Sequence, residues 1–250
     1  MSRERFKKQL FEQFARVGRV LANGHRLELV EFLAQGERAV EALAEVTGLS
    51  VANTSQHLQQ LRRVGLVAAR KDGLHVYYRL ADPAVSKLLG AIQSIAERQF
   101  AEVDRIVRSY LTAKDGLEPV SRADLLERAA RGDVTVLDVR PPVEYAAGHV
   151  PGALNVPVRE LEAQLGKLPR KQEVVAYCRG PYCVLAFEAV AQLRALGFSA
   201  RRLEDGFPEW RLAGLPVEES AAGTDPGPPA VVNTPATRAA PLTQGRRLRG

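Results

Sequence analysis

Apolar residues in the first third of the chain recur at steps of three and four positions, which is the spacing of an amphipathic helix. The pattern runs over residues 5–33 and is interrupted at 23–24, so it predicts two helices. A third helix is expected over residues 40–48 and a fourth over 51–64. Because only a two-residue turn separates these last two helices, they form a tight helix-turn-helix.

A hairpin and a further helix follow. Two runs of β-forming residues flank Lys71-Asp72-Gly73, and Asp-Gly in that position is a strong hairpin signal. Beyond Pro83, apolar residues at helical spacing predict one long amphipathic helix that ends near Gly116. Its apolar stripe is longer than a small domain can cover. We therefore expect a homodimer in which this helix pairs with its symmetry mate.

After Pro119 the pattern changes to strands that alternate with helices. Such alternation predicts an α/β fold with a mainly parallel sheet. The expected strands are residues 134–140, 173–178 and 200–204, and the clearest helix is 184–197.

These patterns predict two domains and a tail. Residues 1–115 form a mainly α domain that contains the helix-turn-helix, the β-hairpin and the dimerising helix, and residues 120–218 form the α/β domain. Residues 219–250 consist largely of Pro, Gly, Ala and Thr with almost no large apolar residue, so we expect a disordered tail. The basic end of the tail either touches nucleic acid or is merely solvated.

The composition narrows the class of protein. The hydrophobic fraction of 46% and the charged fraction of 26% are those of a globular protein. The first residues are charged, and no apolar run is long enough for a signal peptide or a membrane span, which favours a cytoplasmic location without a membrane partner. The chain has 2 cysteines, too few for a disulfide framework, so they suggest thiol chemistry.

The net charge of +6 lies almost entirely in the N-terminal domain. Residues 1–115 carry 18 lysines and arginines against 13 aspartates and glutamates, whereas residues 116–218 carry 13 against 14. A basic excess of this size suits a polyanionic partner but is equally typical of a solvated surface. The choice between a polyanionic partner and a solvated surface therefore depends on the pattern of residues within the helices.

The helix over residues 51–64 has one apolar side and one side that can read base edges. Leu58 and Leu61 lie on the first side, and Asn53, Gln56 and Gln60 lie on the other. Asn and Gln amides can pair bidentately with adenine, although the same residues would also suit the wet face of any surface helix. The candidate DNA-contacting residues, with the cations that would meet the phosphates, are Asn53, Thr54, Ser55, Gln56, His57, Gln59, Gln60, Arg62, Arg63, Arg70, Lys71 and His75.

The string SQHLQQLRRVGLVAARKDGLHVYYRL at residues 55–80 resembles the arsenic-repressor (ArsR) family of winged-helix regulators. The resemblance covers roughly residues 10–110 and implies that residues 1–115 form a winged helix-turn-helix domain for DNA binding and dimerisation, with the β-hairpin as its wing. By the same resemblance, residues 53–60 contact double-stranded DNA, while the wing tip at 71–75 reaches the adjacent groove or backbone. Many members sense metals through Cys or Asp/His ligands, but neither helix that carries such ligands holds a Cys or His here. We expect no metal and no cofactor, and His57 is a phosphate or packing contact.

Cys178 ends a predicted buried strand, and a short loop leads from it into a helix. Open α/β sheets place their chemistry at such carboxyl ends. Loop N–H groups turned inward would form an anion nest, and the helix N-terminus would add positive potential, so both would lower the pKa of the Cys178 thiol. Alternatively, Cys178 is only a small buried apolar residue. The loop residues are Arg179, Gly180, Pro181 and Tyr182, with Gly180 expected to give the turn its freedom.

The segments TVLDVRPPVEYAAGHVPGALNVPV, VVAYCRGPYCVLAFEAVAQLRALGF and LEDGFPEWRLAGLPV resemble, in this order, a rhodanese (sulfurtransferase) domain. The resemblance covers about residues 120–218. It implies that Cys178 accepts a sulfane sulfur as a persulfide whose charge the loop N–H groups hold. The residues expected to scaffold the loop are Asp138, Arg140, Glu144 and His149.

The loop departs from its enzymatic relatives. Dedicated thiosulfate sulfurtransferases usually carry cationic or hydroxyl residues where this loop has Pro181, Tyr182 and Cys183, so thiosulfate turnover is not expected. The related phosphatase loop is one residue longer and closes with an Arg, whereas Val184 stands here and provides no bidentate phosphate contact. Phosphatase activity is therefore excluded.

Cys183 either resolves a modified Cys178, giving a polysulfide or disulfide bridge, or merely packs in the first helical turn. The leading hypothesis is a regulator whose DNA affinity changes when a small sulfur or oxidant species modifies the rhodanese thiol. One alternative is a sulfurtransferase enzyme that uses a Cys178 persulfide, with a DNA-binding module for localisation or autoregulation. Another is a repressor with a purely structural rhodanese domain.

Overall fold

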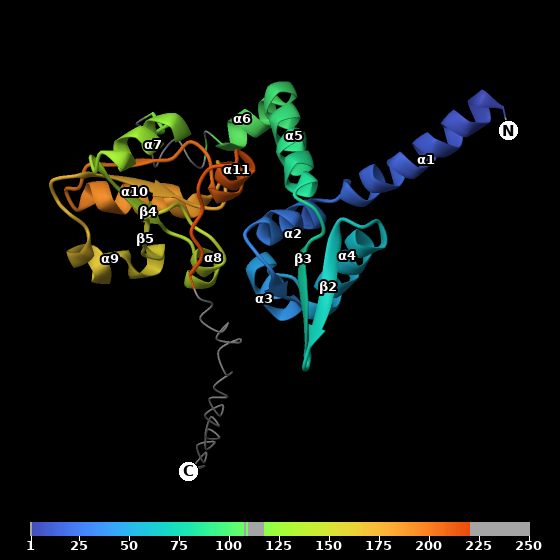
Figure 1. The fold of residues 1–250 in the computed structure, drawn as a ribbon, viewed down its shortest axis with the longest axis horizontal. Helices are drawn as coiled ribbons and strands as arrows, with labels where there is room; N and C mark the ends of the chain where they lie inside the picture. The colour runs from blue at the N-terminus through green and yellow to red at the C-terminus, as the bar shows by residue number, and fades with distance from the viewer. Residues whose placement is uncertain (1, 108, 110–117, 221–250) are drawn as a thin grey trace, which may run out of the picture.

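The computed structural model of the protein describes residues 2–107, 109 and 118–220. Figure 1 shows a helical unit with a small antiparallel sheet beside a unit built on a four-stranded sheet. This is the predicted fold class, with a mainly α winged helix-turn-helix followed by an α/β fold. The predicted tail lies, apart from residues 219 and 220, outside the described residues.

The N-terminal unit begins with the predicted succession of helices. Asn23 caps the second helix through its side chain, and Ser50 caps the fourth in the same way, which fixes where each helix starts. Gly48 ends the third helix in the left-handed conformation, with a φ of 66°. The four helices are α1 (Arg3–Leu21), α2 (Gly24–Ala34), α3 (Val40–Thr47) and α4 (Val51–Arg63).

The hairpin predicted around Asp72-Gly73 is present. It consists of β2 (Val67–Asp72) and β3 (His75–Leu80), and Gly73 takes a φ of 58° in the turn. A short strand, β1 (Arg38–Ala39), pairs antiparallel with β3 on its other side and gives the order β1-β3-β2. The sequence did not reveal β1, because two residues are too few to carry an alternating pattern.

The prediction of one long C-terminal helix in this unit is wrong. The chain forms α5 (Ala84–Gln99), takes an extended conformation at Phe100, and resumes as α6 (Ala101–Val107). The spacing of apolar residues explains the break. Ile95 and Phe100 are five residues apart, whereas a continuous apolar stripe on a helix needs steps of three or four. The predicted end near Gly116 lies outside the described residues.

The C-terminal unit is a parallel sheet in the order β5-β4-β6-β7. The three predicted strands are β4 (Val134–Asp138), β6 (Glu173–Tyr177) and β7 (Ala200–Arg202), and the predicted helix is α10 (Val184–Ala195). The remaining elements are α7 (Arg122–Ala130), α8 (Pro142–Ala146), β5 (Leu154–Asn155), η2 (Val158–Glu160), α9 (Leu161–Gln164), η3 (Leu165–Lys167) and α11 (Phe207–Leu212).

Alternate residues of β6 enter two different hydrophobic cores, as expected for a strand covered on both faces. Val174 and Ala176 pack with residues of α10, whereas Val175 and Tyr177 pack with Trp210 of α11. Cys178, directly after the strand, continues the α10 side. The fold thus places this cysteine at the carboxyl end of a central strand and at the start of α10.

Among residues 2–107, 109 and 118–220, no helix combines the length and the apolarity needed to cross a membrane.

Candidate functional site

The thiol loop, residues 178–183, connects β6 to α10. Cys178 has only 1% of its surface exposed, and Cys183 stands at the N-cap of α10. The two residues are joined by a disulfide across Cα atoms 6.1 Å apart. The sequence predicts thiol chemistry for these cysteines, and the structure holds the pair in its oxidised form. The roles of Cys178 as sulfur acceptor and of Cys183 as resolving thiol stay predictions.

The turn of the thiol loop does not depend on the conformational freedom of Gly180, which is a correction. The amide of Cys183 donates to the carbonyl of Gly180 at 3.1 Å, and Gly180 does not take a positive φ. The glycine that close packing requires is Gly206, where a side chain would collide with the backbone of Arg179 and Gly180. The predicted anion nest stays a prediction.

Arg140 and Asp138 form a fully buried ion pair beside the loop, each with 0% exposure. The Arg140 guanidinium donates to both Asp138 oxygens at 2.6 to 3.1 Å and to the carbonyl of Gly148 at 2.7 Å. Its carbon lies 4.3 Å from the centre of the Phe207 ring. A buried charge pair is tolerable only when its polar atoms are satisfied in this way.

Glu144 holds the side chain of the loop residue Arg179. The Arg179 guanidinium donates to both carboxylate oxygens at 2.7 to 3.1 Å, and Arg38 of the N-terminal unit forms a second ion pair with the same carboxylate. Burial by itself raises the pKa of Glu144, but the Arg179 hydrogen bonds and the two positive charges outweigh it and hold the pKa below its ordinary value.

His149, the fourth predicted scaffold residue, lies apart from this network. Its ring stacks on Tyr145 at 3.6 Å, its Nδ1 is 2.9 Å from the carbonyl oxygen of Tyr145, and its Nε2 is 3.6 Å from the Glu218 carboxylate. These contacts attach the segment that follows α11 to α8. The structure therefore brings Asp138, Arg140 and Glu144 together around the loop and gives His149 different partners.

Helix α2 of the N-terminal unit covers the thiol loop. Gln35, the C-cap of α2 and 0% exposed, donates from Nε2 to the carbonyl of Arg179 at 3.1 Å, and its Oε1 accepts from Arg140 at 3.2 Å. The Arg179 guanidinium lies over the ring of Phe32, 4.8 Å from its centre. Gln35 is not among the predicted site residues, because a polar residue at the end of an apolar helix gives no sign that another domain buries it.

Glu31, one turn before Gln35 on α2, lies beside the loop. A Cβ added at Gly180 would lie 3.6 Å from Glu31 Oε1. Burial raises the pKa of Glu31, and the negative charge of Glu209 adds to this, while Arg179 opposes it. Ionisation of the Glu31 carboxyl therefore lowers the stability of the folded protein.

Tyr182 connects the loop to α5. Burial of the Tyr182 phenol and its hydrogen bond to the Glu97 carboxylate raise the pKa of the phenol. The backbone and side chains of the thiol loop thus contact both α2 and α5 of the N-terminal unit.

The second candidate site is the polar face of α4. Asn53 and Gln56 are exposed, as a base-reading role requires, while Leu58 and Leu61 are buried. The prediction that Thr54 contacts DNA is wrong, because Thr54 is 0% exposed and its hydroxyl donates to the carbonyl of Ser50 at 3.0 Å. Position 54 precedes Leu58 by four residues and therefore shares the face that packs into the core.

Three other candidates on α4, Gln59, Gln60 and His57, already contact other side chains of the chain. Gln60 accepts from Arg26 at 2.7 Å, and Gln59 donates to the Ser55 hydroxyl at 3.3 Å. His57 packs 5.7 Å from the ring of His25, and its Nδ1 is buried without a hydrogen-bond partner. Burial and the positive charge of Arg26 lower the pKa of His57.

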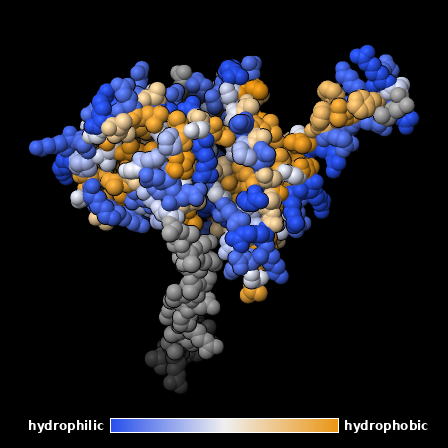
Figure 2. Space-filling view, in the orientation of Figure 1, coloured by the Kyte–Doolittle hydropathy of each residue, from blue (hydrophilic) through white to orange (hydrophobic). Residues whose placement is uncertain are grey.

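The cations predicted to meet phosphates fall into two groups. Arg62, Arg63 and Lys71 are exposed. Arg70 instead pairs with Glu37 at 2.7 Å and with Asp72 at 2.9 Å, and it lies over Tyr77. His75 is 3.6 Å from the Glu41 carboxylate. Leu74, in the turn between β2 and β3, is 95% exposed. Figure 2 shows a small hydrophobic group, in orange, at the tip of the hairpin.

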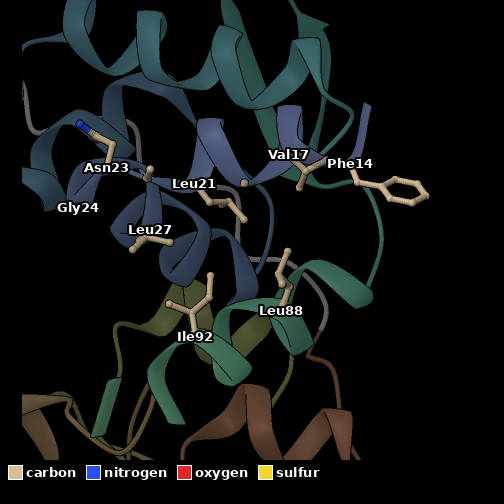
Figure 3. Close-up of a pocket in the computed structure, with 10 residues that line it drawn as sticks. Phe14, Val17, Leu21, Asn23, Gly24, Leu27, Leu88 and Ile92 are labelled. Carbon is tan, nitrogen blue, oxygen red and sulfur yellow. The ribbon is translucent and has the colours of Figure 1, made fainter. Parts of the chain in front are cut away.

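An apolar groove of about 800 Å³ lies between α1, α2 and α5. Figure 3 shows apolar side chains from the three helices turned into it. In Figure 1 helix α1 extends away from the body of the molecule, and its free part carries exposed phenylalanines. The groove residues labelled in Figure 3 include Phe14, Val17, Leu21, Leu27, Leu88 and Ile92. The sequence predicts an uncovered apolar surface on the helix after Pro83, and the structure shows that α1 shares this surface.

Each of the two units matches a known protein family. The family described as "Bacterial regulatory protein, arsR family" matches residues 23–69, and the "Rhodanese-like domain" matches residues 121–213. The chain is 47% identical over 215 residues to "HTH-type transcriptional regulator Rv0324" of Mycobacterium tuberculosis, covering 86% of this chain and 94% of that protein.

Two further similarities are each confined to one unit. A "Sulfurtransferase" of Allochromatium vinosum is 33% identical over 86 residues, which is 34% of this chain and 78% of that protein. A solution structure described as the homodimeric winged helix-turn-helix DNA-binding domain of Mb0332 from Mycobacterium bovis is 45% identical. It covers 40% of this chain and 91% of that one, with a TM-score of 0.37.

Proposed function

Because the chain belongs to the ArsR family of transcriptional regulators and carries a rhodanese-like domain, we propose that it is a homodimeric DNA-binding regulator that senses sulfane sulfur. The sensor is the Cys178–Cys183 pair, and the output is the affinity of α4 and the wing for operator DNA. Oxidants that convert the same pair to its disulfide act through the same site.

Asn53 and Gln56 support the DNA-binding part of this proposal. Both are exposed on α4, and their amides can pair with adenine in the major groove. Arg62, Arg63 and Lys71 are exposed near them in sequence and supply phosphate contacts. Arg70 is already paired with two carboxylates, so we assign it to holding the wing rather than to a phosphate.

The apolar surface of α1 and α5 supports the homodimer. Phe11 and Phe14 are each 57% exposed on α1, and Ile95 is 54% exposed on α5. An uncovered apolar surface of this kind costs free energy in water and is typical of an interface. Pairing with a second copy would bury this surface and fix the distance between the two α4 helices, as operator half-sites require.

The sensing chemistry uses two thiols and one sulfane-sulfur donor, written RSSH. The Cys178 thiolate attacks the outer sulfur of RSSH, which breaks the donor S–S bond, releases RSH and leaves a Cys178 persulfide. The Cys183 thiolate then attacks Cys178 Sγ and expels hydrosulfide. Overall, two thiols and RSSH give the disulfide, RSH and H2S, so that the sulfane sulfur is reduced as the thiols are oxidised. The arrangement that supports the second step is the Cys178–Cys183 bond itself.

The single observation that carries the proposal is that the thiol loop lies against the DNA-binding domain. Arg179 accepts a hydrogen bond from Gln35 of α2, and Tyr182 bonds to Glu97 of α5. A change in the loop therefore reaches α2, which packs against α4, and also α5. The alternative of a turnover enzyme would require Cys178, which is 1% exposed, to be uncovered in every catalytic cycle, whereas a sensor requires this only once per signal.

The test is the binding of the full-length protein to its own promoter DNA, measured by fluorescence anisotropy at fixed salt for the reduced and the polysulfide-treated protein. We expect the dissociation constant to change about 10-fold or more, within the range usual for coupled sites, and Cys178→Ser to abolish the change. Mass analysis of the peptide that contains residues 178–183 follows the sulfur chemistry. An unchanged affinity despite complete conversion of the peptide would contradict the sensor, and steady Cys178-dependent sulfur transfer would favour the enzyme.

A further inference from the structure

Gln35 occupies an unusual position for an uncharged polar side chain. It ends α2, is completely buried, and bridges two parts of the rhodanese-like domain, the carbonyl of Arg179 in the thiol loop and the guanidinium of Arg140. The next residue, Gly36, lies so close to the other domain that an added Cβ would be 2.9 Å from the Ala147 Cβ. The end of α2 is thus in direct contact with the domain that carries the cysteines.

The hydrogen-bonding partners of Gln35 require both ends of an amide. Its Oε1 faces the Arg140 guanidinium, which can only donate, and its Nε2 faces the Arg179 carbonyl, which can only accept. A carboxylate in its place would meet the carbonyl with a negative charge, and an apolar side chain would leave both groups unpaired. Each buried polar group left unpaired destabilises the contact between the two domains.

The same loop residue has a second connection to the DNA-binding domain through its side chain. Arg179 pairs with Glu144, and Glu144 pairs with Arg38. Arg38 lies in β1, which pairs with the wing strand β3 through Arg38 and Tyr78 and leads directly into α3. The backbone of Arg179 therefore contacts α2, and its side chain is linked to the wing sheet.

We propose that Gln35 is the positioning residue through which the state of the thiol loop is transmitted to α2, an inference that rests on the proposed function above. The carbonyl that Gln35 binds belongs to the residue next to Cys178. Cys178 is bonded to Cys183 and is 1% exposed, so a sulfur added to Cys178 needs room that the loop provides only by moving. The Gln35 amide keeps its bond only if α2 follows the carbonyl, so the loop and α2 have linked conformations.

Gln35→Met tests this inference, because methionine has a similar volume and no hydrogen-bonding amide. In the wild type, the ratio of operator dissociation constants between the oxidised and reduced forms is expected to be about 10 or more. In Gln35→Met we expect this ratio to fall to below about 3, while the disulfide still forms and at least one state still binds DNA. Gln164→Met, on the surface of the rhodanese-like domain, should keep the wild-type ratio.

Hydrogen exchange provides a second readout that does not depend on DNA. Amides of residues 31–39 in the wild type should exchange at different rates in the oxidised and reduced protein, and Gln35→Met should remove that difference. If Gln35→Met does not fold, the wild-type comparison alone decides. Equal exchange rates, or a Gln35→Met variant with the full wild-type ratio, would overturn the role of Gln35.

The two proposals fail in different ways. A wild-type affinity ratio of 1 would refute the sensor function, whereas exchange at residues 31–39 would still show whether the loop state reaches α2. A large wild-type ratio that Gln35→Met leaves intact would refute only the inference about Gln35.

Discussion

The polar face of α4 and the surroundings of the thiol loop hold their polar residues in opposite ways. Asn53 and Gln56 on α4 are exposed and free to meet a ligand. Arg140, Glu144 and Gln35 around the loop are at most 1% exposed, and each has partners on more than one segment of the chain. The polar residues of α4 are open to solvent, whereas the polar residues around the loop form contacts within the molecule.

This difference separates function from stability. Under the proposed function, a substitution on the exposed face of α4 removes contacts that form only with DNA, so it should leave the free energy of unfolding almost unchanged. A substitution around the loop leaves a buried charge or polar atom without its partner, so it should alter folding and function together.

The largest effect is expected from Arg140→Ala. It leaves the Asp138 carboxylate, which is 0% exposed, without its counter-charge. Breaking a buried pair in this way costs about 3–5 kcal/mol, so the midpoint of thermal unfolding should fall by roughly 10 °C. Circular dichroism melting measures this, with Arg159→Ala at an exposed position as the control. A melting midpoint equal to that of the control would mean that the loop surroundings are no more constrained than the surface.

Asn53→Ala and Gln56→Ala should each weaken operator binding without changing the melting midpoint. Loss of a bidentate base contact costs about 1–3 kcal/mol, or roughly 5- to 150-fold in the dissociation constant. Thr54→Val, on the same helix but buried, should keep the affinity and lose about 1 kcal/mol of stability with its hydrogen bond. The comparison would break if Thr54→Val weakened DNA binding as much as the two exposed variants.

Glu31→Gln should have the smallest effect, and one that depends on pH. The pKa of Glu31 is raised in the folded protein, so its ionisation costs stability as the pH rises from its ordinary value of 4.5 through the folded pKa, and the full cost is present above that. We therefore expect a higher melting midpoint for Glu31→Gln than for the wild type at pH 7.5, and a difference close to zero at pH 4.5. A difference independent of pH would exclude ionisation as its cause.

Much of this arrangement was predictable because it depends on local pattern. Helical spacing, with an interruption at residues 23–24 and a short turn before residue 51, predicted α2 and α4, and Asp72-Gly73 predicted the hairpin. Alternation of strands and helices predicted the parallel sheet and placed Cys178 at the carboxyl end of a strand. Where local pattern was followed too loosely, as across Phe100, the prediction of one continuous helix was wrong.

The two folds, the helix α4 and the position of the cysteine loop follow from local pattern, because each depends on residues close together in the chain. Three features depend instead on how the chain folds in space: the burial of Thr54, the bond between Cys178 and Cys183, and the hydrogen bond from Gln35 to Arg179 across 144 positions of sequence. Contacts between domains depend on the shape of both surfaces at once, and a glutamine that will be buried by another domain has the same local pattern as one that will face water.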